Sequence, residues 1–175
     1  QVKVGIIYMG GKSFTQTVEG FKAGMKDLGY VDGKNILYET INTSGSKEKI
    51  ANAVKEVIEK KVNVIYAITT PVTKEVQRLT EDKLIPVVFS VVADPVGSKF
   101  VKSIKEPGGN MTGVTNLAIE LTEKRLEMLK RIVPGLKKVM WIENKIIKKC
   151  LERKRFKKMS TPQFLSSYIE GGEIA

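Results

Sequence analysis

Short apolar runs alternate along the chain with longer stretches that are apolar on one side only. The runs have Val and Ile at consecutive positions, as in 62–68, which is typical of strands buried on both faces of a parallel sheet. In the longer stretches, as in 14–28, apolar residues recur at helical spacing, which predicts helices with one buried face. The alternation therefore predicts an α/β fold, a parallel sheet with helices on both faces. Strands are expected at 2–8, 35–41, 62–68, 87–92, 111–115 and 138–142, and helices at 13–28, 46–58, 70–83, 94–104 and 121–132.

Local signals mark where these helices begin and end. Ser13, with a Gln three residues later, has the spacing of a capping box. Ser46 is the expected N-cap of the second helix. The pairs 70–71 and 94–95 each place a capping side chain before a proline, so each is expected to open a helix. Gly29 is expected to end the first helix.

The loops after the strands carry the candidate ligand-binding residues, because ligands of parallel sheets bind outside the carboxyl ends of the strands. The helix that begins near Pro71 offers free backbone N–H groups, and Thr69 and Thr70 add hydroxyl donors, which together suit an anion. Asp94 either caps its own helix or also receives an ammonium group. The full set is Met9, Gly10, Ser13, Thr69, Thr70, Pro71, Asp94 and Asn116.

Some of these residues also have a purely structural interpretation that stays open. Thr70 and Ser13 would then only cap their helices, and Asn116 would only brace a turn. The hypothesis of a site depends on several such groups meeting at one edge of the sheet.

Composition argues against catalysis. The chain has no His and a single Cys, Cys150, which excludes a Ser-His-Asp triad, a Cys-His pair and a Cys-rich zinc site. Gly10 and Gly11 lack the third glycine of a dinucleotide fingerprint, and 11–13 lacks the earlier glycine of a Walker motif. We therefore expect no enzyme activity, no metal and no cofactor.

The net charge of +11 raises the alternative of a nucleic-acid-binding protein. Much of this charge lies in 143–158, which has eight basic and two acidic residues. The remaining lysines lie on predicted helix faces, where a solvated surface is the simpler interpretation. We therefore expect no nucleic-acid partner.

Several motifs in order along the chain resemble a known family. They include 20–35, Ala67-Ile-Thr-Thr-Pro, Ala93-Asp-Pro-Val-Gly and Pro107-Gly-Gly-Asn-Met-Thr-Gly. These look like the ABC-transporter substrate-binding proteins of the tryptophan/tyrosine-binding type, which have the type I periplasmic-binding fold. The resemblance implies two Rossmann-like lobes and a hinge near 115–118. It also implies a non-catalytic protein that binds a small solute in the cleft between the lobes and delivers it to a membrane permease.

The same resemblance implies an aromatic amino acid as the solute and an extracytoplasmic location, periplasmic or lipid-anchored, with the signal segment absent from this chain. It places the first lobe at 1–117, the start of the second at 118–142 and an atypical basic tail at 143–175. The likeness stops after Ile142, so we expect a chain truncated after the first lobe, by a frame shift for example. Uncovered second-lobe surface would then favour a homo-oligomer. A flavodoxin-like enzyme or nucleotide sensor is the other alternative to a binding protein.

Overall fold

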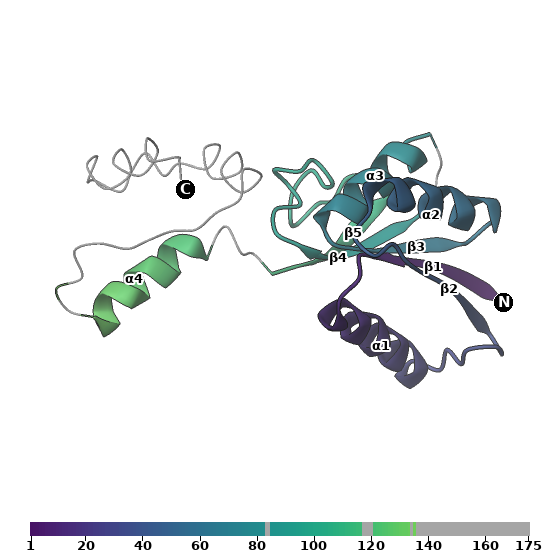
Figure 1. Cartoon of the computed structure of the whole chain (residues 1–175), viewed down its shortest axis with the longest axis horizontal. Helices are drawn as coiled ribbons and strands as arrows, with labels where there is room; N and C mark the ends of the chain where they lie inside the picture. The colour runs from purple at the N-terminus through teal and green to yellow at the C-terminus, as the bar shows by residue number, and fades with distance from the viewer. Residues whose placement is uncertain (83–84, 117–120, 134, 136–175) are drawn as a thin grey trace, which may run out of the picture. The chain divides into compact units, whose positions relative to one another are not determined.

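The computed structural model describes residues 1–82, 85–116, 121–133 and 135, and contains two compact units, Gln1–Leu117 and Ala118–Ala175. The first unit holds all the described strands and three of the helices (Figure 1). No described helix has the length and apolar character needed to cross a membrane. The elements in chain order are β1 Val2–Tyr8, α1 Lys12–Asp27, β2 Ile36–Asn42, α2 Lys47–Glu59, β3 Val64–Ile68, α3 Thr70–Thr80, β4 Val87–Val92, β5 Met111–Thr115 and α4 Thr122–Ile132.

The five strands form one sheet in the order β2-β1-β3-β4-β5, and every neighbouring pair is parallel. Helix α1 covers one face, whereas α2 and α3 cover the other (Figure 1). The predicted α/β sheet with helices on both faces is therefore confirmed. The strand order reverses at β1, since the chain adds β2 on one side and then β3 on the other. The carboxyl ends of β1 and β3 thus flank a topological switch point, where open α/β sheets form ligand crevices.

The core lies in two layers, one on each face of the sheet. On one face, Val18 of α1 packs with Ile6 and Ile68. On the other, α2 and α3 contribute fully buried valines, such as Val57 and Val76. Strand β3 supplies residues to both layers, which explains why its sequence is apolar at every position.

Most predicted elements are confirmed, with small shifts at their ends. The Ser46 side chain accepts a hydrogen bond from the Lys49 backbone N–H at 3.5 Å, as expected of an N-cap. Gly29 has φ 88° and follows α1 as predicted. Leu28, which was expected on the buried face of this helix, is exposed because it lies in the cap where the chain turns away.

Two predicted helix starts are wrong. Helix α1 begins at Lys12 after Gly11, which has φ 82° and makes no side-chain cap bond, so Ser13 lies within the first turn and not at the cap. Helix α3 begins at Thr70, and its N-cap is Thr69. In both cases a residue with positive φ turns the chain into the helix, a device that the capping pattern does not reveal.

The helix predicted over 94–104 is also wrong, because this segment forms a series of turns. The Asp94 carbonyl accepts the Ser98 N–H at 3.0 Å, which is the hydrogen bond of one helical turn. The helix does not propagate, since Lys99 adopts φ 61°, in the left-handed region. The chain then returns toward the start of β5. The strand predicted at 138–142 and the tail at 143–175 lie outside the described residues.

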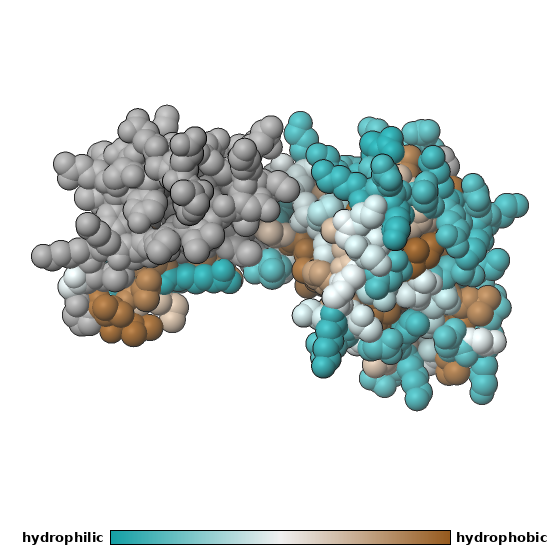
Figure 2. Space-filling view, in the orientation of Figure 1, coloured by the Kyte–Doolittle hydropathy of each residue, from teal (hydrophilic) through white to brown (hydrophobic). Residues whose placement is uncertain are grey.

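The described part of the second unit is a single helix, α4. Glu127 forms ion pairs with Lys124 at 2.8 Å and Arg131 at 2.9 Å along its surface. Its apolar residues Met128 and Ile132 are exposed, and apolar residues are visible on this helix in Figure 2. In the same view the first unit is mostly hydrophilic, with small separate apolar patches.

Candidate functional site

The parallel register brings the predicted site residues to one edge of the sheet. Ile7 pairs with Ala67, Ile68 with Ser90, and Val92 with Thr115. The residues that follow these strand ends, Met9, Thr69, Asp94 and Asn116 among them, therefore lie at the carboxyl edge. Ser13, Thr70 and Pro71 lie in the first turns of α1 and α3, which begin at the same edge.

Thr69 is the central residue of this edge. Its backbone N–H donates to the Ser90 carbonyl at 3.0 Å, and its own carbonyl accepts the backbone N–H and the hydroxyl of Thr73, at 3.0 and 2.9 Å. Its φ of 88° is unusual for a β-branched residue. The residue is only 8% exposed, and its Oγ1 is buried without a hydrogen-bond partner among the described residues.

An unpartnered buried hydroxyl is unfavourable unless something else bonds to it. This one lies at the start of the 11-residue helix α3, where the first backbone N–H groups have no intrahelical acceptor and the helix dipole is positive. Thr70 is half-buried and Pro71 is exposed in the same turn. The arrangement suits an anionic group such as a carboxylate.

The loop after β1 is held by a residue that the sequence analysis missed. Asn42, the last residue of β2, accepts hydrogen bonds through Oδ1 from the backbone N–H groups of Gly10 at 2.7 Å and Ser44 at 2.9 Å. Gly10 has φ 32°, and a Cβ there would lie 3.4 Å from the Ser44 Cα. An Asn directly at a strand end was the available signal. Asn42 thus fixes the floor of the loop that carries Met9, which packs partly buried against the core.

Asp94 has a structural role that the sequence left open. It is 4% exposed, and its Oδ1 accepts the Gly97 backbone N–H at 2.7 Å. A Cβ on Gly97 would collide with this carboxylate. Asp94 therefore stabilises the turn after β4. Asn116 and Ser13 are exposed at the same edge of the sheet.

A second buried hydroxyl without a partner among the described residues belongs to Tyr38, on β2. Its ring makes an edge contact with Phe21 of α1, and the Lys22 ammonium lies 5.1 Å from the ring centroid. Burial and the nearby Asp32 raise the pKa of Tyr38. These contacts lie on the α1 face and indicate packing, so Tyr38 does not belong to the edge site.

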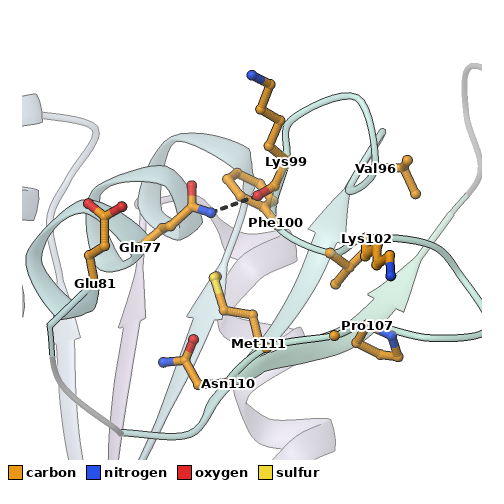
Figure 3. Close-up of a pocket in the computed structure, with 12 residues that line it drawn as sticks. Gln77, Glu81, Val96, Lys99, Phe100, Lys102, Pro107, Asn110 and Met111 are labelled. Carbon is orange, nitrogen blue, oxygen red and sulfur yellow. Dashed lines mark hydrogen bonds between the residues drawn. The ribbon is translucent and has the colours of Figure 1, made fainter.

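A hollow of about 460 Å³ lies elsewhere on the first unit, between α3 and the 96–111 segment (Figure 3). The Gln77 amide donates to the Lys99 carbonyl at 2.7 Å across it. Met111, the first residue of β5, lines this hollow. The hollow therefore lies toward the amino edge of the sheet. None of the eight predicted site residues lines this hollow. Within the described ranges, no group of three or more His, Cys, Asp or Glu residues is placed to hold a metal.

Comparisons with known proteins agree with this architecture. Residues 2–164 match the family model described as ABC transporter substrate binding protein. The expectation that the likeness to the family stops after Ile142 is therefore wrong, since the match continues to residue 164. The chain is 34% identical over 133 residues to the tyrosine-binding protein of Clostridioides difficile (strain R20291), a match that covers 75% of this chain and 37% of that protein.

Two solved structures are similar as well. One is an ABC domain from Streptococcus pneumonia in complex with L-Trp, with a TM-score of 0.61, 28% identity, and coverage of 66% of this chain and 38% of that chain. The other is the ligand-free, open structure of a substrate binding protein with adhesive properties from Clostridium difficile. Its TM-score is 0.73 and its identity 27%, over 87% of this chain and 52% of that chain. The chain thus spans between 37% and 52% of the length of these relatives.

Proposed function

Since the chain belongs to the family of ABC transporter substrate-binding proteins, we propose that it is the solute-binding component of an ABC uptake transporter. In this role it binds a small solute and delivers it to a membrane permease, without catalysing a reaction. Family membership favours this role over a flavodoxin-like enzyme or nucleotide sensor and over a nucleic-acid-binding protein. Substrate-binding proteins of ABC transporters are extracytoplasmic, and we assign this chain to the same side of the membrane.

The carboxyl edge of the sheet forms one wall of the solute site in this proposal. The observation that carries it is the buried Thr69 hydroxyl, which has no partner among the described residues and lies at the N-terminus of α3. A solute carboxylate would accept hydrogen bonds from this hydroxyl and from the free N–H groups of the first helical turn. The position beside the switch point between β1 and β3 supports the same site.

We infer that the solute is an amino acid with an aromatic side chain. The α-carboxylate matches the helix N-terminus, and the names of two relatives, one tyrosine-binding and one solved with L-Trp, support the aromatic class. We assign 1–117 to the first lobe, 118–142 to the start of the second and 143–175 to a basic tail. The division of the chain between Leu117 and Ala118 supports the first boundary.

The first unit contributes one wall of the site in this proposal, and one wall by itself should bind weakly, because solute pockets typically bury about 70–90% of a ligand. For the first unit alone we expect a dissociation constant no better than about 1 mM, which corresponds to about 4 kcal/mol. A second lobe would tighten it by enclosing the solute, and uncovered apolar surface on the second unit would favour homo-oligomers.

Calorimetric titration of the full chain tests this function. L-Tryptophan and L-phenylalanine should bind, whereas tryptamine and phenethylamine, which lack the carboxylate, should bind at least about tenfold more weakly, since a charged hydrogen bond contributes about 1.5–3 kcal/mol. Equal affinity for the amino acids and the amines would contradict the carboxylate site.

A further inference from the structure

Strand β4 contains one residue more than its partner near the carboxyl edge. Phe89 pairs with Gly113, and the next pairing joins Val92 to Thr115, so three steps along β4 match two along β5. Phe89 and Val92 are both buried on the α2/α3 face. The extra residue forms a β-bulge, which removes Val91 from the inward positions and leaves this residue 39% exposed.

The bulge lies directly beside Thr69. The Thr69 N–H donates to the carbonyl of Ser90, the residue before Val91. Val91 has φ 55°, and of the five non-glycine residues with positive φ in the described part of the chain, only Thr69 and Val91 are β-branched. Two unfavourable backbone conformations therefore lie at the ends of adjacent strands, where strained residues commonly serve ligand binding.

Neither burial nor backbone preference explains a valine at this position. Its side chain is too exposed to contribute fully to the core, and glycine would adopt the same φ without strain. An apolar contact with a bound molecule would account for both features. Neighbouring strands lie about 4.8 Å apart, so Val91 lies roughly one strand spacing from Thr69. This spacing between Val91 and Thr69 is similar to the distance between the carboxylate of an amino acid and its side chain.

We propose that Val91 is the residue on which the apolar side chain of the solute packs. The proposal rests on the function above, in which the carboxylate binds at the start of α3. Val91 then helps determine specificity: the site accepts amino acids with aromatic or large apolar side chains and discriminates against glycine and aspartate, which offer no apolar surface to cover the valine.

Methyl ¹H–¹³C NMR of the full chain during titration with millimolar L-tryptophan tests this contact. The Val91 resonances, assigned by their loss in Val91→Ala, should move because of the indole ring current. Those of Val31, an equally exposed valine remote from this edge, should stay. Val91→Gly should bind L-tryptophan about fivefold more weakly, as expected for the loss of a partly covered apolar side chain.

The matched control is Lys61→Gly. Lys61 also has positive φ, 53°, but it lies after α2 on the side of the sheet where β3 begins. Both glycine variants should melt at a higher temperature because strain is relieved, and only Val91→Gly should lose affinity. The inference would be overturned if the Val91 methyl resonances did not move and Val91→Gly bound L-tryptophan with unchanged affinity. The proposed function would stay intact in that case if the Thr70 amide resonance still shifted. No shift at any residue of the edge would overturn both.

Discussion

Replacing Thr69 by valine separates the folding role of this residue from its binding role. The two side chains have nearly the same shape, so the substitution removes a hydroxyl and little else. In the structure this hydroxyl is buried and has no hydrogen-bond partner among the described residues. Its removal should therefore relieve a desolvation penalty of about 1–3 kcal/mol, the usual value for an unsatisfied buried polar group.

The expected result is a more stable protein that binds less well. For a domain of this size, 1 kcal/mol shifts the melting temperature by about 2–8 °C, so Thr69→Val should melt several degrees higher. If the hydroxyl donates to a solute carboxylate, its loss should weaken affinity by roughly 1.5–3 kcal/mol, about 10- to 150-fold. The assays are thermal denaturation by circular dichroism and an NMR titration with L-tryptophan.

Thr80→Val is the matched control at the other end of the same helix. The Thr80 hydroxyl is buried and donates to the Val76 carbonyl at 2.8 Å. This variant should lose about 0.5–1.5 kcal/mol of stability without changing solute affinity. The reasoning is refuted if Thr69→Val is destabilised as much as Thr80→Val, or if it binds L-tryptophan as well as the unchanged chain does.

Two further predictions concern the turn after β4 and helix α3. Gly97→Ala should lose about 1–3 kcal/mol of stability by overpacking, because its methyl would collide with Asp94, whereas Gly109→Ala, with no neighbour within 4 Å, should be nearly neutral in urea denaturation. The hydrogen bond from Arg78 lowers the pKa of Glu75 from 4.5. The ion pair between these two side chains therefore stabilises the fold at neutral pH, and this stabilisation is lost as the pH falls through the lowered pKa. At neutral pH the unchanged protein should be more stable than Glu75→Gln by under about 1 kcal/mol, the usual value for a surface pair. This difference should vanish in acid. A difference independent of pH would contradict the ion pair.

The sequence was sufficient for the sheet because its signals there agree with one another. Strand β3 and the part of β1 from Val4 onward have no charged residue, and the structure buries them on both faces. Helix α2 combines a capping serine with an apolar face, and both features are confirmed. The carboxyl-edge location of the predicted residues follows from the parallel pairing. That they bind a solute remains a prediction.

The sequence failed where backbone conformation decides the structure. The pairs 70–71 and 94–95 look alike, yet only the first opens a helix, because Val72 and Val76 of α3 pack on the sheet whereas Lys99 turns the second segment back. The bulge at Val91 was invisible for a related reason. Five of the six residues in β4 are apolar, so the sequence offers no alternation from which a shift of one residue is detectable.

The backbone amides of the edge test the central claim most directly. Two-dimensional ¹H–¹⁵N NMR of the full chain with L-tryptophan should move the resonances of Thr70 and Val72 in the first turn of α3, together with those of the β1 and β4 loops. The residues of the hollow near Gln77 and Lys99 should stay unchanged. Shifts confined to that hollow, or an unchanged spectrum at millimolar solute, would contradict a solute site at the carboxyl edge.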